Sequence, residues 1–138
     1  MNRSLRLIAA AMTGLILGCQ ADDQVAGLDP ARGPGALEIR LVTPNAEDGA
    51  LLLTLSGGPV DSITSAAFEI VSLESAPREY RVLVRGAIHS GTVARLWVPE
   101  RENQSAYVAS VAEAVGRASY ARRDVAGYAV SVGLNGNQ

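Results

Sequence analysis

The stretch Glu79-Tyr80-Arg81-Val82-Leu83-Val84-Arg85 carries the clearest structural signal in this chain. Tyr80, Val82 and Val84 alternate with charged residues, so they fall on one face of an extended backbone. This pattern predicts a β-strand with one face in a core and the other in water. The same period of two recurs in further segments, whose predicted inward residues are Leu37, Ile39 and Leu41; Leu51, Leu53 and Leu55; Phe68 and Ile70; Ala94, Leu96 and Val98; and Tyr128, Val130 and Val132.

Turn-forming residues separate these segments. The stretch Thr43–Gly49 is rich in residues that suit turns, so residues 37–55 are predicted to form a hairpin. Roughly six or seven short strands at this spacing favour an all-β fold, a small antiparallel β-sandwich, with a small closed barrel as the alternative. No long crossover helix is indicated, which argues against a parallel α/β sheet. In outline the arrangement is similar to immunoglobulin-like and cohesin-like modules.

The segment 105–118 fits two interpretations. A helix would place Val108, Val111, Ala112 and Val115 together. A strand would align Tyr107, Ala109, Val111 and Val115, with Glu113 interrupting the alternation. The β-branched content and the surrounding strands favour the strand. The preceding residues 99–104 are predicted to form a charged loop.

The N-terminus reads as an export signal. Arg3 and Arg6 precede the apolar run Leu7–Leu17, which is shorter than the about 20 apolar residues that a membrane-spanning helix needs. The run ends in Leu15-Ile16-Leu17-Gly18-Cys19, which contains the only cysteine of the chain. This stretch resembles the lipobox of bacterial lipoproteins, although Ile16 and Leu17 depart from the residues that the pattern prefers.

The resemblance implies that a diacylglycerol is attached to the Cys19 thiol and that the signal is cleaved between Gly18 and Cys19. Two or three acyl chains give stable membrane anchoring, at roughly 0.8 kcal/mol per buried methylene. The expected organisation is a signal helix over residues 1–18, a flexible linker over 19–35, a β-sandwich over 36–134 and a frayed tail over 135–138. The protein would then lie in the bacterial cell envelope, outside the cytoplasm, on a membrane that the sequence leaves open.

The composition of the chain argues against some classes of function. The chain has 12 basic residues, all arginine, against 14 acidic ones, for a formal net charge of −2. A mildly acidic domain is a poor candidate for nucleic-acid binding, which needs a basic surface. With one cysteine no intrachain disulfide can form, so packing alone must hold the domain.

The candidate catalytic and metal-binding residues are few. His89 is the only histidine and is followed by Ser90, but adjacent residues on a strand point to opposite faces, so an exposed turn is favoured over a catalytic pair. Asn45, Glu47 and Asp48 could offer oxygens to calcium, yet a plain polar turn is favoured, because the EF-hand spacing is missing. We therefore expect no catalytic residue, no metal site and no cofactor.

A surface patch is the main binding candidate. If Ala94, Leu96 and Val98 face the core, Trp97 and Arg95 face outward, and Leu52 and Leu83 are out of phase in the same way. Together, Trp97, Arg95, Leu52 and Leu83 could form an exposed apolar patch, and such patches mark interaction sites. The alternative is that Trp97 covers an edge of the core. Arg122 and Arg123 are interpreted as solvated loop charges, with an anionic partner as the alternative.

Two functional hypotheses follow. The first is a lipid-anchored, non-enzymatic envelope module that contacts a protein or a glycan. The second is an envelope hydrolase, or an inhibitor of one, acting on wall or host polymers. An enzyme would need converging acid and base groups, and the four candidates Glu38, Glu69, Glu79 and Asp124 are scattered along the chain.

Overall fold

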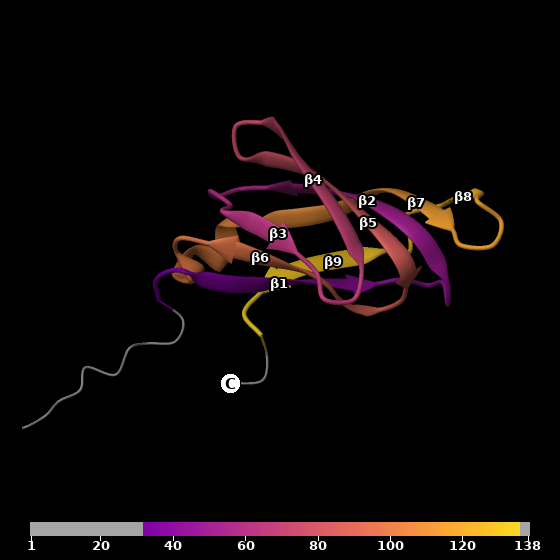
Figure 1. Ribbon diagram of the computed structural model, residues 1–138, viewed down its shortest axis with the longest axis horizontal. Helices are drawn as coiled ribbons and strands as arrows, with labels where there is room; N and C mark the ends of the chain where they lie inside the picture. Colours follow the sequence, from indigo (N-terminus) through magenta and orange to yellow (C-terminus); the bar gives the residue numbers. More distant parts are fainter. Residues whose placement is uncertain (1–31, 136–138) are drawn as a thin grey trace, which may run out of the picture.

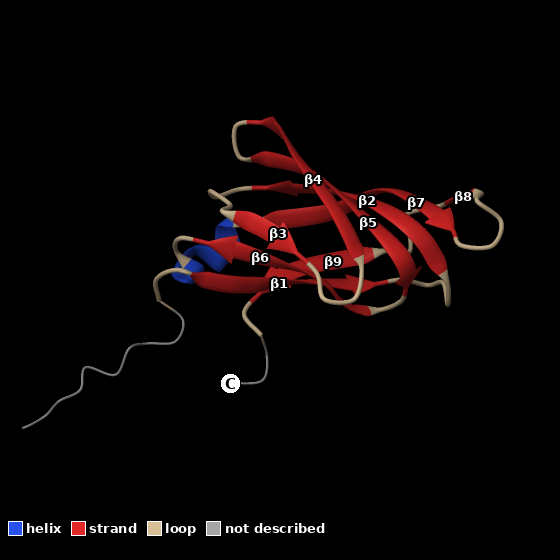
Figure 2. Ribbon diagram, in the orientation of Figure 1, coloured by secondary structure: helices blue, strands red, loops and turns tan. Residues whose placement is uncertain are grey.

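The computed structural model describes residues 32–135, which form two antiparallel sheets that pack face to face (Figures 1 and 2). The predicted all-β fold is confirmed. The proposed signal over residues 1–18, Cys19 and most of the linker lie outside the described residues, as do residues 136–138. Within residues 32–135, no helix is long and apolar enough to span a membrane.

Nine strands and one short helix make up the described fold. In chain order they are β1 (Gly35–Val42), β2 (Asp48–Ser56), β3 (Ser62–Thr64), β4 (Glu69–Ala76), β5 (Glu79–Ile88), β6 (Gly91–Val98), the 3₁₀ helix η1 (Arg101–Ala106), β7 (Val108–Gly116), β8 (Arg122–Arg123) and β9 (Ala129–Gly133). One sheet has four strands in the order β3-β6-β1-β9, and the other has five in the order β4-β5-β2-β7-β8.

The predicted hairpin over residues 37–55 is wrong. Strand β1 pairs with β6 and β9, whereas β2 pairs with β5 and β7 in the other sheet. The turn at 43–47 therefore carries the chain from one sheet to the other. This connection lets Leu37, Ile39 and Leu41 face the leucines of β2 across the core, which buries both sets fully.

The core lies between the two sheets and follows the predicted alternation. Its fully buried large side chains are Leu37, Ile39, Leu41, Leu51, Leu53, Leu55, Val82, Val84, Ile88, Val93, Leu96 and Val98. Each such burial contributes about 1.5–3 kcal/mol relative to an exposed side chain. Phe68, Ile70, Tyr128, Val130 and Val132, which were also predicted to face inward, are partly buried against this cluster.

Strand β7 confirms the favoured interpretation of residues 105–118. A register shift in the β2–β7 ladder places Leu53 opposite Val111 and Leu52 opposite Glu113, so Ala112 is the extra residue of a bulge. The bulge explains why Glu113 interrupts the alternation in the sequence. The predicted loop at 99–104 is partly wrong, since η1 begins at Arg101.

The chain enters the sandwich at the end that carries η1. The backbone N–H of Arg101 donates to the Gly33 carbonyl at 3.0 Å, and the Glu102 carboxylate accepts from the Gly33 N–H at 2.9 Å. These contacts attach residues at the end of the predicted linker to the folded domain. The turns at 43–47, 89–90 and 117–121 lie at the opposite end (Figure 1).

Candidate functional site

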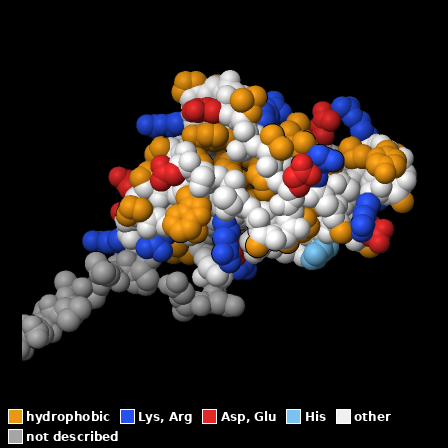
Figure 3. Space-filling view, in the orientation of Figure 1, with side chains coloured by type: hydrophobic (Ala, Val, Ile, Leu, Met, Phe, Trp, Pro, Cys, Tyr) orange, Lys and Arg blue, Asp and Glu red, His pale blue; other side chains and the backbone are white. Residues whose placement is uncertain are grey.

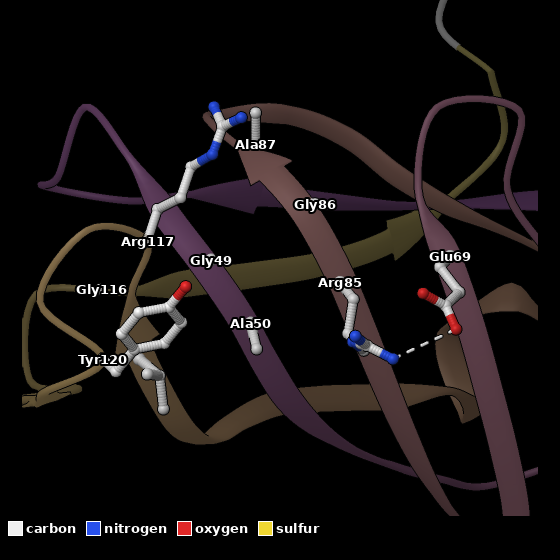
Figure 4. Close-up of a pocket in the computed structure, with 10 residues that line it drawn as sticks. Gly49, Ala50, Glu69, Arg85, Gly86, Ala87, Gly116, Arg117 and Tyr120 are labelled. Carbon is white, nitrogen blue, oxygen red and sulfur yellow. Dashed lines mark hydrogen bonds and ion pairs between the residues drawn. The ribbon is translucent and has the colours of Figure 1, made fainter.

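An open hollow of about 510 Å³ lies on the outer face of the five-stranded sheet (Figure 4). Its lining residues are Gly49, Ala50, Glu69, Arg85, Gly86, Ala87, Val115, Gly116, Arg117 and Tyr120. Glycines and alanines dominate its floor, and the larger side chains stand on either side. This volume falls in the range of about 300–1,000 Å³ that is usual for small-molecule sites.

The hollow forms where the strand register shifts. Asp48 pairs with Ile88 and Ala50 pairs with Arg85, so two residues of β5, Gly86 and Ala87, lie opposite the single residue Gly49 of β2. The β2–β7 ladder shifts at the same place, because Asp48 pairs with Gly116 and Ala50 with Val115. Bulges bend strands and redirect side chains, and here they leave a surface of near-bare backbone.

Glycine is required at two points of the floor. A Cβ on Gly49 would lie 2.7 Å from the Cα of Arg117, so only glycine permits the β7–β8 turn to approach β2 this closely. Gly86 has φ +146°, a conformation that residues with a side chain rarely adopt. The floor is thus fixed by backbone geometry.

Tyr120 forms one wall of the hollow from the β7–β8 turn. It is 84% exposed and has φ +52°, which is unusual for an aromatic residue. Two backbone hydrogen bonds of 3.0 Å close the turn, from the Tyr120 N–H to the Gly116 carbonyl and from the Gly116 N–H to the Ala121 carbonyl. The turn therefore holds a large aromatic ring in water beside the sheet.

Charged side chains surround the floor. On the wall opposite Tyr120, Arg85 and Glu69 form an exposed ion pair at 3.3 Å (Figure 4). Arg117 rises beside the Tyr120 wall, and among residues 32–135 its guanidinium has no hydrogen bond or ion pair. Arg122 is paired with Glu113 at 2.9 Å on the same sheet. In the space-filling view, hydrophobic side chains gather at this end of the molecule with charged groups around them (Figure 3).

A polar cluster next to the hollow fixes the β7–β8 unit in place. We define it as Thr43, Asn45, Asp48, Arg123 and Tyr128. Asp48 is fully buried, and its carboxylate accepts from the Thr43 hydroxyl at 2.7 Å and from the Tyr128 hydroxyl at 2.8 Å. Arg123 Nε lies 3.1 Å from Asp48 Oδ1, and Arg123 also donates to the Asn45 side-chain carbonyl at 2.8 Å.

This cluster revises two of the sequence interpretations. Asn45 and Asp48 do come together, but the guanidinium of Arg123 supplies the positive charge that calcium would have supplied. Within residues 32–135, no group of three or more His, Cys, Asp or Glu residues could hold a metal ion. Arg123 is therefore an internal ion-pair partner, and its interpretation as a solvated loop charge is wrong.

The cluster also perturbs Tyr128. Burial raises the pKa of the Tyr128 hydroxyl, and its hydrogen bond to Asp48 raises that pKa further. Burial likewise raises the pKa of Tyr107, whose hydroxyl donates to the Pro59 carbonyl at 2.7 Å at the other end of the domain. Both hydroxyls are held as protonated donors.

The predicted patch is divided between the two sheets. Trp97 and Arg95 project from β6 on the outer face of the four-stranded sheet, where Trp97 is 48% exposed. Leu52 and Leu83 pair with each other on β2 and β5, and project from the outer face of the five-stranded sheet. The four residues therefore do not form one surface, because the core separates the two faces.

The other candidate residues do not converge. His89 Nδ1 lies 3.2 Å from the Ala87 carbonyl, and the Ser90 hydroxyl instead contacts the backbone of Thr43, at 3.0 and 3.3 Å. Of the four scattered carboxylates, Glu38 lies on β1, Glu69 on β4, Glu79 on β5 and Asp124 after β8. Glu38 is nearly buried, where it accepts from Arg40 and Thr92.

Sequence reasoning missed the hollow. Gly49 belongs to the turn predicted over residues 43–49, and Tyr120 stands in a segment without a periodic pattern. The usable signal was a tyrosine within a short polar turn, Arg117-Ala118-Ser119-Tyr120, directly after a strand. An aromatic side chain in such a turn cannot reach the core and therefore stays exposed.

No protein-family model matches this sequence, and no curated protein or solved structure gives a significant match. The class of protein is therefore described by its own architecture. It is an antiparallel β-sandwich with four-stranded and five-stranded sheets and an open, arginine-flanked hollow on the larger sheet.

Proposed function

We propose that this protein is a lipid-anchored, non-catalytic binding domain of the bacterial envelope, and that the hollow is its binding site. The lipobox resemblance at Cys19 supports the anchor. The single observation that carries the binding role is Tyr120, an exposed ring held at φ +52° beside a floor of small residues.

Energetic reasoning favours a functional role for Tyr120. A residue in a sparsely populated backbone region costs of order 1–3 kcal/mol, and such strain clusters at binding sites. Glycine or asparagine would adopt this conformation more easily. A tyrosine that gains almost no burial there contributes little to folding, so its ring is better explained by a contact with a ligand.

The position of the hollow fits a tethered domain. The chain enters at Gly33–Gly35, beside η1, whereas the hollow lies at the end formed by the turns at 43–47 and 117–121 (Figure 1). The tether is thus attached at the end of the domain opposite the hollow. A partner outside the membrane could reach it without competing with the tether.

The anchor is tested by fractionation and mass spectrometry in the native bacterium. We expect the wild-type protein in the membrane fraction, with an acylated N-terminal peptide that begins at Cys19, and Cys19→Ala in the soluble fraction. An unmodified N-terminus at another residue, or a Cys19→Ala protein that still sediments with membranes, would reject the lipid anchor.

The binding site is tested by adding labelled full-length protein, solubilised in detergent, to purified envelope fragments. We expect saturable binding that Tyr120→Asn abolishes, because asparagine keeps the left-handed backbone but removes the ring. Arg81→Gln is the matched control, since Arg81 is exposed on β5 but does not line the hollow. Equal binding by Tyr120→Asn and wild type would exclude the hollow as the site.

A further inference from the structure

We infer that the hollow recognises a carboxylated sugar, a ring with apolar C–H faces, hydroxyl groups and one carboxylate. This inference rests on the proposed function, because it names the ligand class of the same site. Three features of the hollow support this inference, namely its floor, its aromatic wall and the guanidinium of Arg117.

The floor and the wall suit a flat, weakly apolar ring. Gly49, Ala50 and Gly86 present backbone and methyl groups, so nothing projects into the space that a ring would occupy. The Tyr120 ring stands beside that floor, with most of its surface in water (Figure 4). Aromatic rings bury large apolar areas at low entropic cost, and a sugar offers them the C–H face that they can stack on.

The rim supplies the polar contacts. Arg85 and Glu69 present a donor and an acceptor on the wall facing Tyr120, where their mutual ion pair at 3.3 Å holds them in position. The two groups match the mixed donor and acceptor character of sugar hydroxyls. A purely apolar ligand would remove water from these charged groups without replacing its hydrogen bonds, which disfavours such a ligand.

Arg117 sets the preference for an anion. Glu69 compensates Arg85 and Glu113 compensates Arg122, but within the described residues Arg117 has no acidic partner. The rim therefore carries one uncompensated positive charge, on the guanidinium that lies near Ala87 in Figure 4. A guanidinium binds a carboxylate through two parallel hydrogen bonds, so a carboxylate on the sugar completes the site.

The test is a titration of ¹⁵N-labelled full-length protein in detergent micelles, followed by amide chemical shifts. The probes are trigalacturonate, the neutral trisaccharide maltotriose, and sodium sulfate at matched ionic strength. We expect trigalacturonate to shift the amides of Gly86, Gly116 and Tyr120 saturably, and maltotriose to bind about ten-fold more weakly, as expected for loss of one charged contact.

Substitutions at Tyr120 and Arg117 test which part of the sugar each side chain contacts. Tyr120→Asn should abolish trigalacturonate binding, and Tyr120→Phe should keep it, because the stacking face remains. Arg117→Gln should weaken trigalacturonate binding about ten-fold and leave maltotriose binding unchanged, since only the acid uses the charge. Arg81→Gln should change neither.

The outcomes separate this inference from the proposed function. Equal affinity for maltotriose and trigalacturonate would overturn the acidic preference while leaving a sugar-binding domain. Sulfate shifts at the same amides that compete fully with trigalacturonate would overturn sugar recognition in favour of a simple anion site. No saturable shift with either sugar would overturn the inference, whereas the envelope-binding assay would still decide the proposed function.

Discussion

Arg123 Nε lies 3.1 Å from Oδ1 of Asp48, a carboxylate that is fully buried between the sheets. The pair joins β8, which has two residues, to the start of β2. Strand β8 also pairs with Ala114 and Val115 of β7, and Arg123 donates to the Asn45 side chain and to the Glu47 carbonyl. The ion pair is the contact that joins β8 to a fully buried group of the core.

We predict that Arg123→Met lowers the free energy of unfolding by about 3–5 kcal/mol, because it leaves a buried carboxylate without its countercharge. The matched control is Arg122→Met in the neighbouring residue. Its exposed ion pair with Glu113 is expected to contribute only about 0–1 kcal/mol. Urea unfolding of both variants checks this, and similar losses would contradict the special role of the buried pair.

Alkaline pH should destabilise the domain through Tyr128. The pKa of Tyr128 is raised in the folded state by burial and by the Asp48 hydrogen bond, so folding favours the protonated hydroxyl. The resulting stability is fully present below the unfolded pKa of about 10 and is lost as pH rises through the folded pKa.

The corresponding measurement is the free energy of unfolding over a pH series. Wild type should lose stability more steeply above about pH 10 than Tyr128→Phe, which has no proton to lose. Adding Tyr107→Phe should flatten the curve further, since burial raises the pKa of Tyr107 as well. An identical alkaline slope in wild type and the double variant would show that other groups cause the loss.

The sequence predicted which residues enter the core, because burial follows the period of two. Leu37, Ile39, Leu96 and Val98 are buried as their alternation indicated, and Trp97 points outward. Periodicity carries no information on strand partners, however. The same pattern suits a hairpin partner or a strand in the facing sheet, which is why β1 and β2 were wrongly joined.

The hollow could not be predicted from the sequence for a related reason. It depends on the register shifts at Gly49 in the β2–β5 and β2–β7 ladders, and a bulge appears in sequence only as a broken alternation. The polar cluster was equally hidden, since Asp48 and Arg123 lie far apart in the chain and look like ordinary turn residues. A polar residue that becomes fully buried is recognised only when its partners are known.

Alanine substitutions at two glycines, at opposite ends of the sandwich, distinguish the cost of backbone strain from the cost of steric overlap. Gly57 has φ +134° and Gly91 has φ +140°, so alanine is strained at both positions. A Cβ at Gly57 would overlap the Ala106 carbonyl, whereas Gly91 has nothing within 4 Å. We predict that Gly91→Ala costs roughly 1–3 kcal/mol and that Gly57→Ala costs more. Thermal unfolding compares them, and equal losses would mean that the Ala106 backbone yields freely.

Trp97 gives a fluorescence test of the sandwich itself. It is the only tryptophan in the chain and lies on the outer face of the four-stranded sheet, 48% exposed, opposite Ala36 and Ser62 on the neighbouring strands. These small neighbours cannot cover an indole. We predict red-shifted emission from the native protein, strong quenching by iodide, and a small further shift on unfolding in urea.

Trp97 fluorescence also shows which of the two outer faces binds the ligand. Trp97 and the hollow are on opposite sides of the core, so trigalacturonate that shifts the hollow amides should leave Trp97 emission and its iodide quenching unchanged. Trp97→Phe should likewise leave ligand affinity unchanged, while Tyr120→Asn removes it. Blue, quencher-resistant emission would place the indole in an interior site and contradict the described face. Ligand-dependent quenching would mean that the ligand binds the four-stranded sheet instead.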